Sequence, residues 1–235
     1  MSSTKATARR AGVLYLLLAV IGPINDIYVP NAFIVPGDAA ATAHKIASAE
    51  LTYRIGIVSG LAANVVFLFL VLSLYDLLKD VDRRQARLMV ILVSVSVAVA
   101  VVNLFNQIAP LILLSGADFF SVFTKAQLDA LALGFLRLRS NATYVDMAFW
   151  GLWLFPFGVL VIKSGFFPRV LGALLIIGCF AYLTVSFTAL VFPAHRQLVS
   201  QVALPFFAVG ELSMIVWLLV KGAKVPLPEA LPGAS

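Results

Sequence analysis

The chain has 235 residues, of which 62% are hydrophobic and 12% charged, and its mean hydropathy is +1.02. Soluble globular domains carry about 45–50% apolar and about 25% charged residues, so this composition excludes an ordinary water-soluble domain and indicates a membrane protein. The net charge of +6 suits contact with anionic lipid headgroups. Because the basic residues are spread over several loops, the charge does not indicate a nucleic-acid partner.

Six apolar runs are long enough to cross a bilayer as helices, since a span needs about 20 residues. They cover residues 11–29, 51–78, 88–114, 142–162, 170–192 and 199–220. The runs are continuous and lack the alternating polarity of membrane barrel strands. We therefore expect an all-α, polytopic membrane protein in which residues 1–235 form a single integral membrane domain. A cleaved signal peptide is the alternative for the first run, but its apolar region would be shorter, at about 7–15 residues.

Two of the predicted outer loops have features of short interfacial helices. Residues 33–50 begin with a Pro-Gly turn and continue as an Ala-rich stretch. In residues 115–139, Thr124 and Gln127 have the spacing of a capping box. Apolar residues then recur at helical spacing at Leu128, Leu131, Phe135 and Leu138.

The second of these helices is expected to lie along the membrane surface with its apolar face toward the lipid. Asp129, Arg137 and Arg139 would then point toward water or lipid headgroups. A plain loop with a helical bias is the alternative for this stretch.

The positions of Lys and Arg predict the orientation, because cytoplasmic loops carry the excess of these residues. One side holds Lys5, Arg9, Arg10, Lys79, Arg83, Arg84, Arg87, Lys163, Arg169, Lys221 and Lys224. The other side holds Lys45, Arg54, Lys125, Arg137, Arg139 and Arg196. Both termini are therefore expected in the cytoplasm, with membrane lipids as the surrounding partners.

Four segments resemble a known family. They are Ile34-Val-Pro-Gly-Asp-Ala-Ala-Ala-Thr-Ala43, Glu50-x-x-x-Arg54-Ile-Gly-Ile, Lys163-Ser-Gly-Phe-Phe-Pro-Arg-Val-Leu-Gly172 and Gly210-Glu-Leu-Ser-x4-Leu-Leu-Val-Lys-Gly222. From about Arg9 to Gly222 the chain resembles the bacterial multi-pass membrane proteins called domain of unknown function 4386. The resemblance implies a bacterial inner-membrane location and assigns no activity.

Polar side chains inside the apolar runs are the candidate functional residues, because a charge at the bilayer centre costs about 2.5–3.5 kcal/mol. Glu211 lies ten positions before Lys221, or about 15 Å along a helix, which predicts a place near the midplane. Asn64 and Asn103 are expected at a similar depth and would face Glu211 if the three helices meet.

A polar stripe continues from Asn103 toward the outer side, because Asn106 and Gln107 share its helical face. Asp146 of the fourth run and Asp26, near the end of the first, can join this stripe. The alternative is structural, since membrane helices use amide hydrogen bonds simply to hold together.

Asp26 and Arg54 are expected at matching depth near the outer interface, where they could form an ion pair. Trp150 and Trp153 share a face with Asp146 and could wall a pocket. Such a pocket would reach from the outer side to Glu211.

Metal, redox and hydrolase chemistry find little support in the sequence. Cys179 is the single cysteine, and His44 and His195 are the two histidines, which is too few for a usual zinc site or disulfide framework. No phosphate-binding glycine loop or nucleophile elbow is visible. We therefore expect no cofactor and no metal, and the sequence favours a non-enzymatic role over an enzyme.

Glycine and proline predict local packing features. Gly56 and Gly60 have the spacing of a close contact between membrane helices. Pro110, Pro156 and Pro205 are expected to kink their helices. Three functions follow as hypotheses: binding or transport of a small molecule, ion or proton at Glu211; a non-transporting sensor or partner subunit; and an enzyme acting on a lipid or quinone through Glu211 and Asp146.

Overall fold

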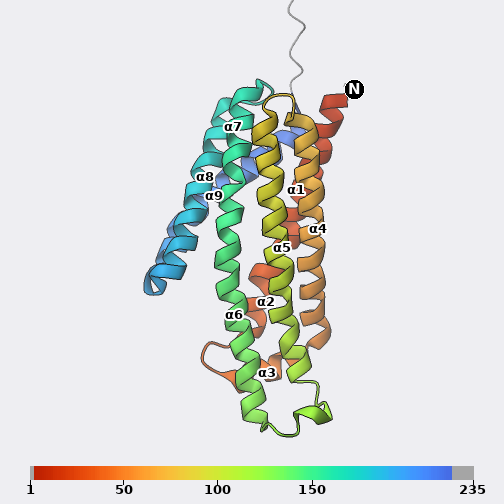
Figure 1. Ribbon diagram of the computed structural model, residues 1–235, viewed down its shortest axis with the longest axis vertical. Helices are drawn as coiled ribbons and strands as arrows, with labels where there is room; N and C mark the ends of the chain where they lie inside the picture. Colours follow the sequence, from red (N-terminus) through yellow and green to blue (C-terminus); the bar gives the residue numbers. More distant parts are fainter. Residues whose placement is uncertain (1–2, 224–235) are drawn as a thin grey trace, which may run out of the picture.

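The computed structural model describes residues 3–223, which form helices joined by short turns, with no strand in that range (Figure 1). The helices in chain order are α1 (Ser3–Pro23), the π-helix η1 (Ile24–Tyr28), α2 (Val29–Phe33), α3 (Ala39–Ser48), α4 (Glu50–Leu78), α5 (Arg83–Leu113), the 3-10 turn η2 (Asp118–Phe120), α6 (Lys125–Leu152), α7 (Leu154–Ser164), α8 (Arg169–Val191), the 3-10 turn η3 (Pro193–His195) and α9 (Arg196–Val220).

Six stretches are long and apolar enough to cross a membrane. They are Thr4–Phe33, Glu50–Leu78, Arg83–Leu113, Lys125–Ser164, Arg169–Val191 and Pro193–Val220. The predicted all-α architecture with six membrane-spanning helices is confirmed. The largest difference from the expected bounds is in the fourth stretch, which combines α6 and α7 and begins 17 residues before residue 142.

The six stretches close a ring in which each packs against two neighbours. The order around the ring is α1, α4, α5, α6 with α7, α8 and α9, and α9 packs again on α1. In Figure 1 the turn that joins α8 to α9 lies to the left of α6, away from the rest of the bundle. Because the helices form a ring, side chains from helices that are distant in the sequence can meet in its interior.

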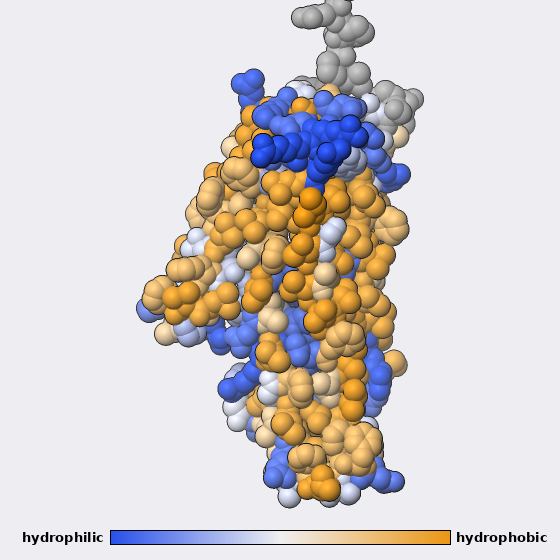
Figure 2. Space-filling model, in the orientation of Figure 1, coloured by the Kyte–Doolittle hydropathy of each residue, from blue (hydrophilic) through white to orange (hydrophobic). Residues whose placement is uncertain are grey.

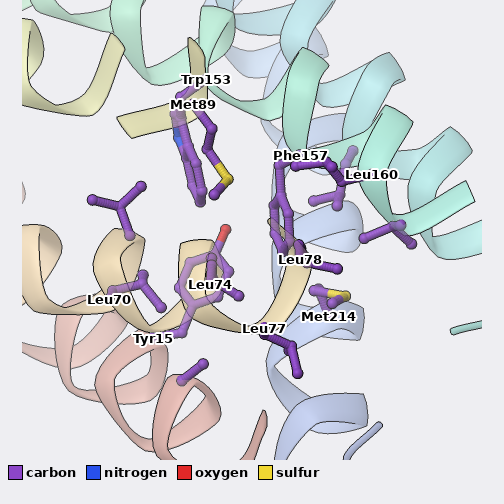
Figure 3. Close-up of a cluster of buried hydrophobic side chains, with 14 of the residues drawn as sticks. Tyr15, Leu70, Leu74, Leu77, Leu78, Met89, Trp153, Phe157, Leu160 and Met214 are labelled. Carbon is purple, nitrogen blue, oxygen red and sulfur yellow. The ribbon is translucent and has the colours of Figure 1, made fainter. Parts of the chain in front are cut away.

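An apolar core fills the ring near its upper end (Figure 3). Trp153 stacks on Phe157 with ring centroids 5.3 Å apart, and Tyr15 meets the edge of Trp153 at 6.0 Å. Leu74 and Met214 are fully buried in the same core. A second, smaller core packs against α3 and is formed by Val29, Phe33, Ile46, Tyr53 and Leu136.

One end of the bundle is hydrophilic. Figure 2 shows a hydrophilic band at the upper end, where Figure 1 places the α4–α5 and α7–α8 turns. A Cβ added at Gly222 would lie 3.2 Å from Lys5 Cγ, so the two ends of the described chain meet there. These segments carry the basic residues that the sequence assigns to one side, apart from Lys224, which lies outside the described residues.

The helix expected in residues 115–139 forms, but the expectation that it lies along the membrane surface is wrong. The capping box at Thr124 and Gln127 is present, but the helix that it starts continues without a break to Leu152. Asp129 and Arg139, expected in water or lipid headgroups, are only 3% and 4% exposed.

One feature of the sequence and one of the packing explain this difference. No glycine or proline separates residue 139 from residue 142, so nothing ends the helix there. The apolar stripe that contains Leu131, Phe135 and Leu138 faces outward, and the opposite face packs against α3 and α5. Arg137 is exposed, as expected.

Prolines mark the two breaks within spanning stretches. Pro156 cannot donate to the carbonyl of Leu152, and the chain leaves the helix at Trp153 between α6 and α7. Pro23 ends α1, where the π-helix begins. Pro110 and Pro205 lie inside α5 and α9, which continue through them.

Candidate functional site

Three helices bring one carboxyl and two hydroxyls together to form the Glu211 cluster (Tyr15, Tyr182 and Glu211). Tyr15 of α1 donates a hydrogen bond of 2.6 Å to Oε2 of Glu211 on α9. Tyr182 of α8 donates to the other carboxyl oxygen, Oε1, at 2.8 Å. Within residues 3–223, no Lys, Arg or His forms an ion pair with Glu211. Both carboxyl oxygens are therefore held by neutral partners.

Small residues allow α8 and α9 to approach closely beside this cluster. A Cβ added at Gly210 would lie 2.9 Å from the carbonyl oxygen of Leu174, and one added at Gly178 would lie 3.3 Å from Cα of Phe207. The Tyr182 ring stacks on that of Phe207 with centroids 4.1 Å apart. Close helix packing at glycine thus fixes the direction in which the Tyr182 hydroxyl points.

Aromatic rings border the Glu211 cluster. Tyr15 contacts Trp153, which belongs to the upper core. Tyr182 meets the edge of Trp150 at 6.3 Å. Glu211, Tyr182 and Trp150 are each half-buried, so this carboxyl lies at the boundary of the apolar core.

A second polar group, the Arg139 cluster (Asn25, Asp26, Asn103, Asn106, Gln107 and Arg139), joins η1, α5 and α6. Arg139 Nε donates to Oε1 of Gln107 at 2.8 Å. Its Nη2 donates to the backbone oxygen of Asn25 at 2.8 Å and lies 3.2 Å from Oδ1 of Asp26. The guanidinium is thus paired with one carboxylate and two neutral oxygens.

The π-helix explains why the carbonyl of Asn25 is available. The N–H of Val29 bonds to the carbonyl of Ile24, and Pro30, the next residue, has no N–H to donate. Neither residue can therefore satisfy the Asn25 oxygen, and Arg139 does so from another helix. Such π-helical turns occur often at functional sites.

Gly56 and Gly60 of α4 make room for η1. A Cβ at Gly60 would lie 2.7 Å from Cγ of Asn25, and one at Gly56 would collide with Cγ2 of Val29. Larger residues at these positions would push η1 away from α4. The expected close-packing role of this glycine pair therefore extends to positioning Asn25 for Arg139.

Amides complete the Arg139 cluster. Asn103 donates to the backbone oxygen of Arg139 at 3.0 Å, and Asn106 donates to Oδ1 of Asn103 at 3.0 Å. Two buried atoms, Oδ1 of Asn25 and Nε2 of Gln107, have no hydrogen-bond partner. An unpaired buried polar atom costs about 1–3 kcal/mol, so one acceptor and one donor of this cluster are left unsatisfied by the protein.

A family model corresponding to "Domain of unknown function (DUF4386)" matches residues 10–222. The chain belongs to this family. None of the curated proteins and none of the solved structures compared with the chain matches it. Family membership therefore agrees with the resemblance seen in the sequence, and the site of this DUF4386 chain has to be interpreted from its own geometry.

The structure does not unite all the candidate residues. Asp26, Asn103, Asn106 and Gln107 come together, but around Arg139 and away from the partners of Glu211. Asn64 bonds to the Gly60 carbonyl of its own helix at 2.9 Å. The expected meeting of Glu211 with Asn64 and Asn103 is not formed, because α9 packs on α1 and α8.

The expected ion pair between Asp26 and Arg54 is also wrong. Arg54 is exposed and bonds at 2.7 Å to Glu50, four residues earlier on α4. Asp26 is paired with Arg139 instead. Residues four apart on a helix are neighbours, so the local partner satisfies Arg54.

Asp146 has a site of its own. The Ser96 hydroxyl of α5 donates to Oδ1 of Asp146 at 2.6 Å, and Asp146 is 2% exposed. Trp150, an expected wall of a pocket at Asp146, hydrogen-bonds to Asp146 and also meets the Tyr182 ring beside Glu211. Trp153, the other expected wall, contacts Tyr15.

Three important residues were missed as site residues: Arg139, Tyr15 and Tyr182. Arg139 was assigned to a surface helix, although a helix continuing past residue 139 would have placed it on the same face as Asp146, seven residues on. The tyrosines lie in apolar runs and carry no local signal, since their role depends on which helices are neighbours.

Two shallow surface hollows are lined by residues of neither cluster. One follows the outer face of α6 and is lined by Phe123, Leu131, Phe135 and Leu138, among others. The second lies on the outer face of η1, at Ile24 and Ile27. In residues 3–223, no group of three or more His, Cys, Asp or Glu is placed to hold a metal ion.

Proposed function

We propose that the protein is a bacterial inner-membrane protein that binds and transports a proton, or a small cation in its place, at Glu211. Its basic end would face the cytoplasm, because basic residues concentrate on that side of membrane proteins. The observation that carries the proposal is the pair of tyrosine hydroxyls on the Glu211 carboxyl, without a cationic partner in residues 3–223.

The chemistry of this carboxyl supports the proposal. A glutamine could accept or donate hydrogen bonds to the same tyrosines without a charge, so packing alone does not require an acid at residue 211. A carboxyl held by neutral hydroxyls either carries a proton or needs an external cation to balance it. Tyrosine hydroxyls can both donate and accept hydrogen bonds, so they can stabilise either form by rotating.

The Arg139 cluster would not oppose a cation that approaches Glu211 from the outer side. The charge of Arg139 is balanced by Asp26, which lessens its repulsion of an approaching cation. The Asp26 side chain is 32% exposed although Arg139 is buried. The unpaired atoms of Asn25 and Gln107, which lie in the same cluster as Arg139, could bind a water molecule.

Proton or cation movement in proteoliposomes tests this proposal. A pH-sensitive dye inside the vesicles would report flux after a pH step, with and without added Na⁺ or K⁺. We expect flux from the wild-type protein and none from Glu211→Gln. Glu50→Gln, which removes a carboxyl exposed on α4, is the matched control and should behave as wild type. Equal flux from the wild-type protein and Glu211→Gln would contradict the proposal.

A second candidate is a non-transporting sensor or partner subunit. The hollow on α6 favours it, because a helix of a membrane partner could fill this shallow, largely apolar surface at Phe123, Leu131 and Leu138. The double variant Leu131→Ser/Phe135→Ser should then lose its association with a co-purifying membrane protein. Glu211→Gln should associate with that protein as the wild type does.

The third candidate, an enzyme acting on a lipid or quinone, would need Glu211 and Asp146 to work as a pair. Glu211 is held by two tyrosines, and Asp146 is held by Ser96 and Trp150. Trp150 lies between Asp146 and Tyr182, and within the described residues no hydrogen bond joins the two carboxyls directly, so the geometry favours the first two candidates.

A further inference from the structure

Three arginines, Arg83, Arg84 and Arg87, lie close together on the first turns of α5 at the hydrophilic end, where some of the other basic residues are paired with carboxylates. Lys79 lies 3.2 Å from Asp76, and Lys163 lies 2.8 Å from Asp82. Arg83, Arg84 and Arg87 are exposed and form no ion pair with any residue in the range 3–223. The positive charge at this position is therefore not balanced by the protein.

The spacing of the three arginines brings their charges together. Arg87 is four residues after Arg83 and three after Arg84, so all three side chains extend from adjacent positions on the helix surface. Like charges at this spacing destabilise a helix. The carboxylate of Asp82 is already engaged by Lys163 and by the N–H of Gln85, and the exposed Asp80 forms no ion pair with them.

An exposed apolar stripe lies directly below the arginines on the same helix. Leu88, Ile91 and Val95 are 41%, 58% and 38% exposed, and their spacing keeps them on the face that begins at Arg84 and Arg87. Figure 2 shows the same order on the visible face, with a hydrophilic band above an apolar surface. A molecule with an anionic head and apolar chains matches both parts.

We propose that Arg83, Arg84 and Arg87 bind the phosphate of an anionic phospholipid whose acyl chains lie along Leu88, Ile91 and Val95. One guanidinium group can donate two parallel hydrogen bonds to the oxygens of a phosphate. The amino-terminal end of α5 adds a partial positive charge. This site is independent of Glu211 and of any flux through the protein.

Retention of lipid on the purified protein tests the proposal. The protein would be placed in nanodiscs of equal parts phosphatidylglycerol and phosphatidylcholine, extracted into mild detergent and examined by native mass spectrometry. We expect retained phosphatidylglycerol on the wild-type protein and at least a tenfold loss in Arg83→Gln/Arg84→Gln/Arg87→Gln, since each basic residue near an anionic surface contributes to binding. Added glycerol phosphate should not compete, because it lacks acyl chains.

A matched triple variant separates a site from general charge attraction. Arg54→Gln/Arg137→Gln/Arg196→Gln removes three exposed positive charges elsewhere on the protein and should retain phosphatidylglycerol as the wild type does. Equal loss in both triples, equal retention in both, or competition by glycerol phosphate would overturn the proposal. If the first triple does not fold, Arg87→Gln alone decides: a several-fold loss supports the site, and unchanged retention overturns it.

Discussion

The Arg139 cluster and the Glu211 cluster each hold a charge-bearing group between packed helices, but they balance its charge differently. Arg139 has a carboxylate, an amide oxygen and a backbone carbonyl as partners, whereas Glu211 has two hydroxyls. The first arrangement neutralises its charge within the protein, and the second leaves charge balance to something that arrives. The balanced cluster therefore suits a structural role, and the unbalanced one suits binding.

Removing Arg139 should have the largest effect on stability. Arg139→Met leaves Asp26 without its cation and the Asn25 carbonyl without a donor, which should cost about 3–5 kcal/mol of unfolding free energy. Unfolding in mixed micelles measures this loss. Arg137→Met, an exposed arginine two residues away, should change stability by less than about 0.5 kcal/mol. Similar losses in the two variants would remove the structural role assigned to Arg139.

Crowding the Arg139 cluster should have the next largest effect. Gly60→Ala places a methyl group against Asn25 and should cost about 1–3 kcal/mol through overpacking. Gly134→Ala on α6 is the control, because nothing lies within 4 Å of its added Cβ. It should stabilise the helix by about 0.5–1 kcal/mol. A neutral Gly60→Ala would show that η1 is free to shift.

The hydroxyls of the Glu211 cluster should contribute less. Tyr182→Phe removes one hydrogen bond and should cost about 1 kcal/mol. In a Glu211→Gln background the cost should change, because residues in contact are not additive. Tyr28→Phe, on an exposed tyrosine, is the control and should be near neutral. A double-mutant cycle without coupling between Tyr182 and Glu211 would argue against the bond between them.

The smallest effect should come from the exposed ion pair at the hydrophilic end, which lies outside both clusters. The hydrogen bond from the Lys163 side chain, aided by the N–H of Gln85, holds the pKa of Asp82 below its ordinary value of 3.8. A depressed pKa means that the stabilisation is complete above the ordinary pKa and is lost as pH falls through the lower value. The stability difference between wild type and Asp82→Asn should therefore shrink in strong acid.

Thermal unfolding across a pH series checks this prediction. Lys163→Gln removes the main cause of the shift and should reduce the difference in the same pH range. A wild-type advantage over Asp82→Asn that grows as the pH falls would have the wrong sign for this ion pair.

Much of the fold could be predicted from the sequence, because apolar runs of sufficient length have one main use in a membrane. The capping box at Thr124 was also readable, since it depends on residues three apart. The direction of the helix that begins there could not be predicted, because the outward apolar stripe of α6 resembles the apolar stripe of a surface helix. The opposite face of α6 is buried by α3 and α5, and residue spacing within α6 does not predict those contacts.

The sites were less predictable than the fold. The depth of Glu211 could be estimated by counting residues, but its partners Tyr15 and Tyr182 depend on the order of helices around the ring. The polar stripe of Asn103, Asn106 and Gln107 was visible as a helical face. Its partner Arg139 was not, since the availability of the Asn25 carbonyl depends on a π-helix that sequence spacing does not reveal.

The most direct test of the central claim is infrared difference spectroscopy of the carboxyl groups of the membrane-reconstituted protein, titrated over the pH range in which it stays folded. We expect a protonated carboxyl band that appears and disappears with pH in the wild type, shifts in Tyr15→Phe and Tyr182→Phe, and is absent from Glu211→Gln. Wild-type and Glu211→Gln spectra that titrate identically would contradict the claim that this carboxyl exchanges a proton or cation.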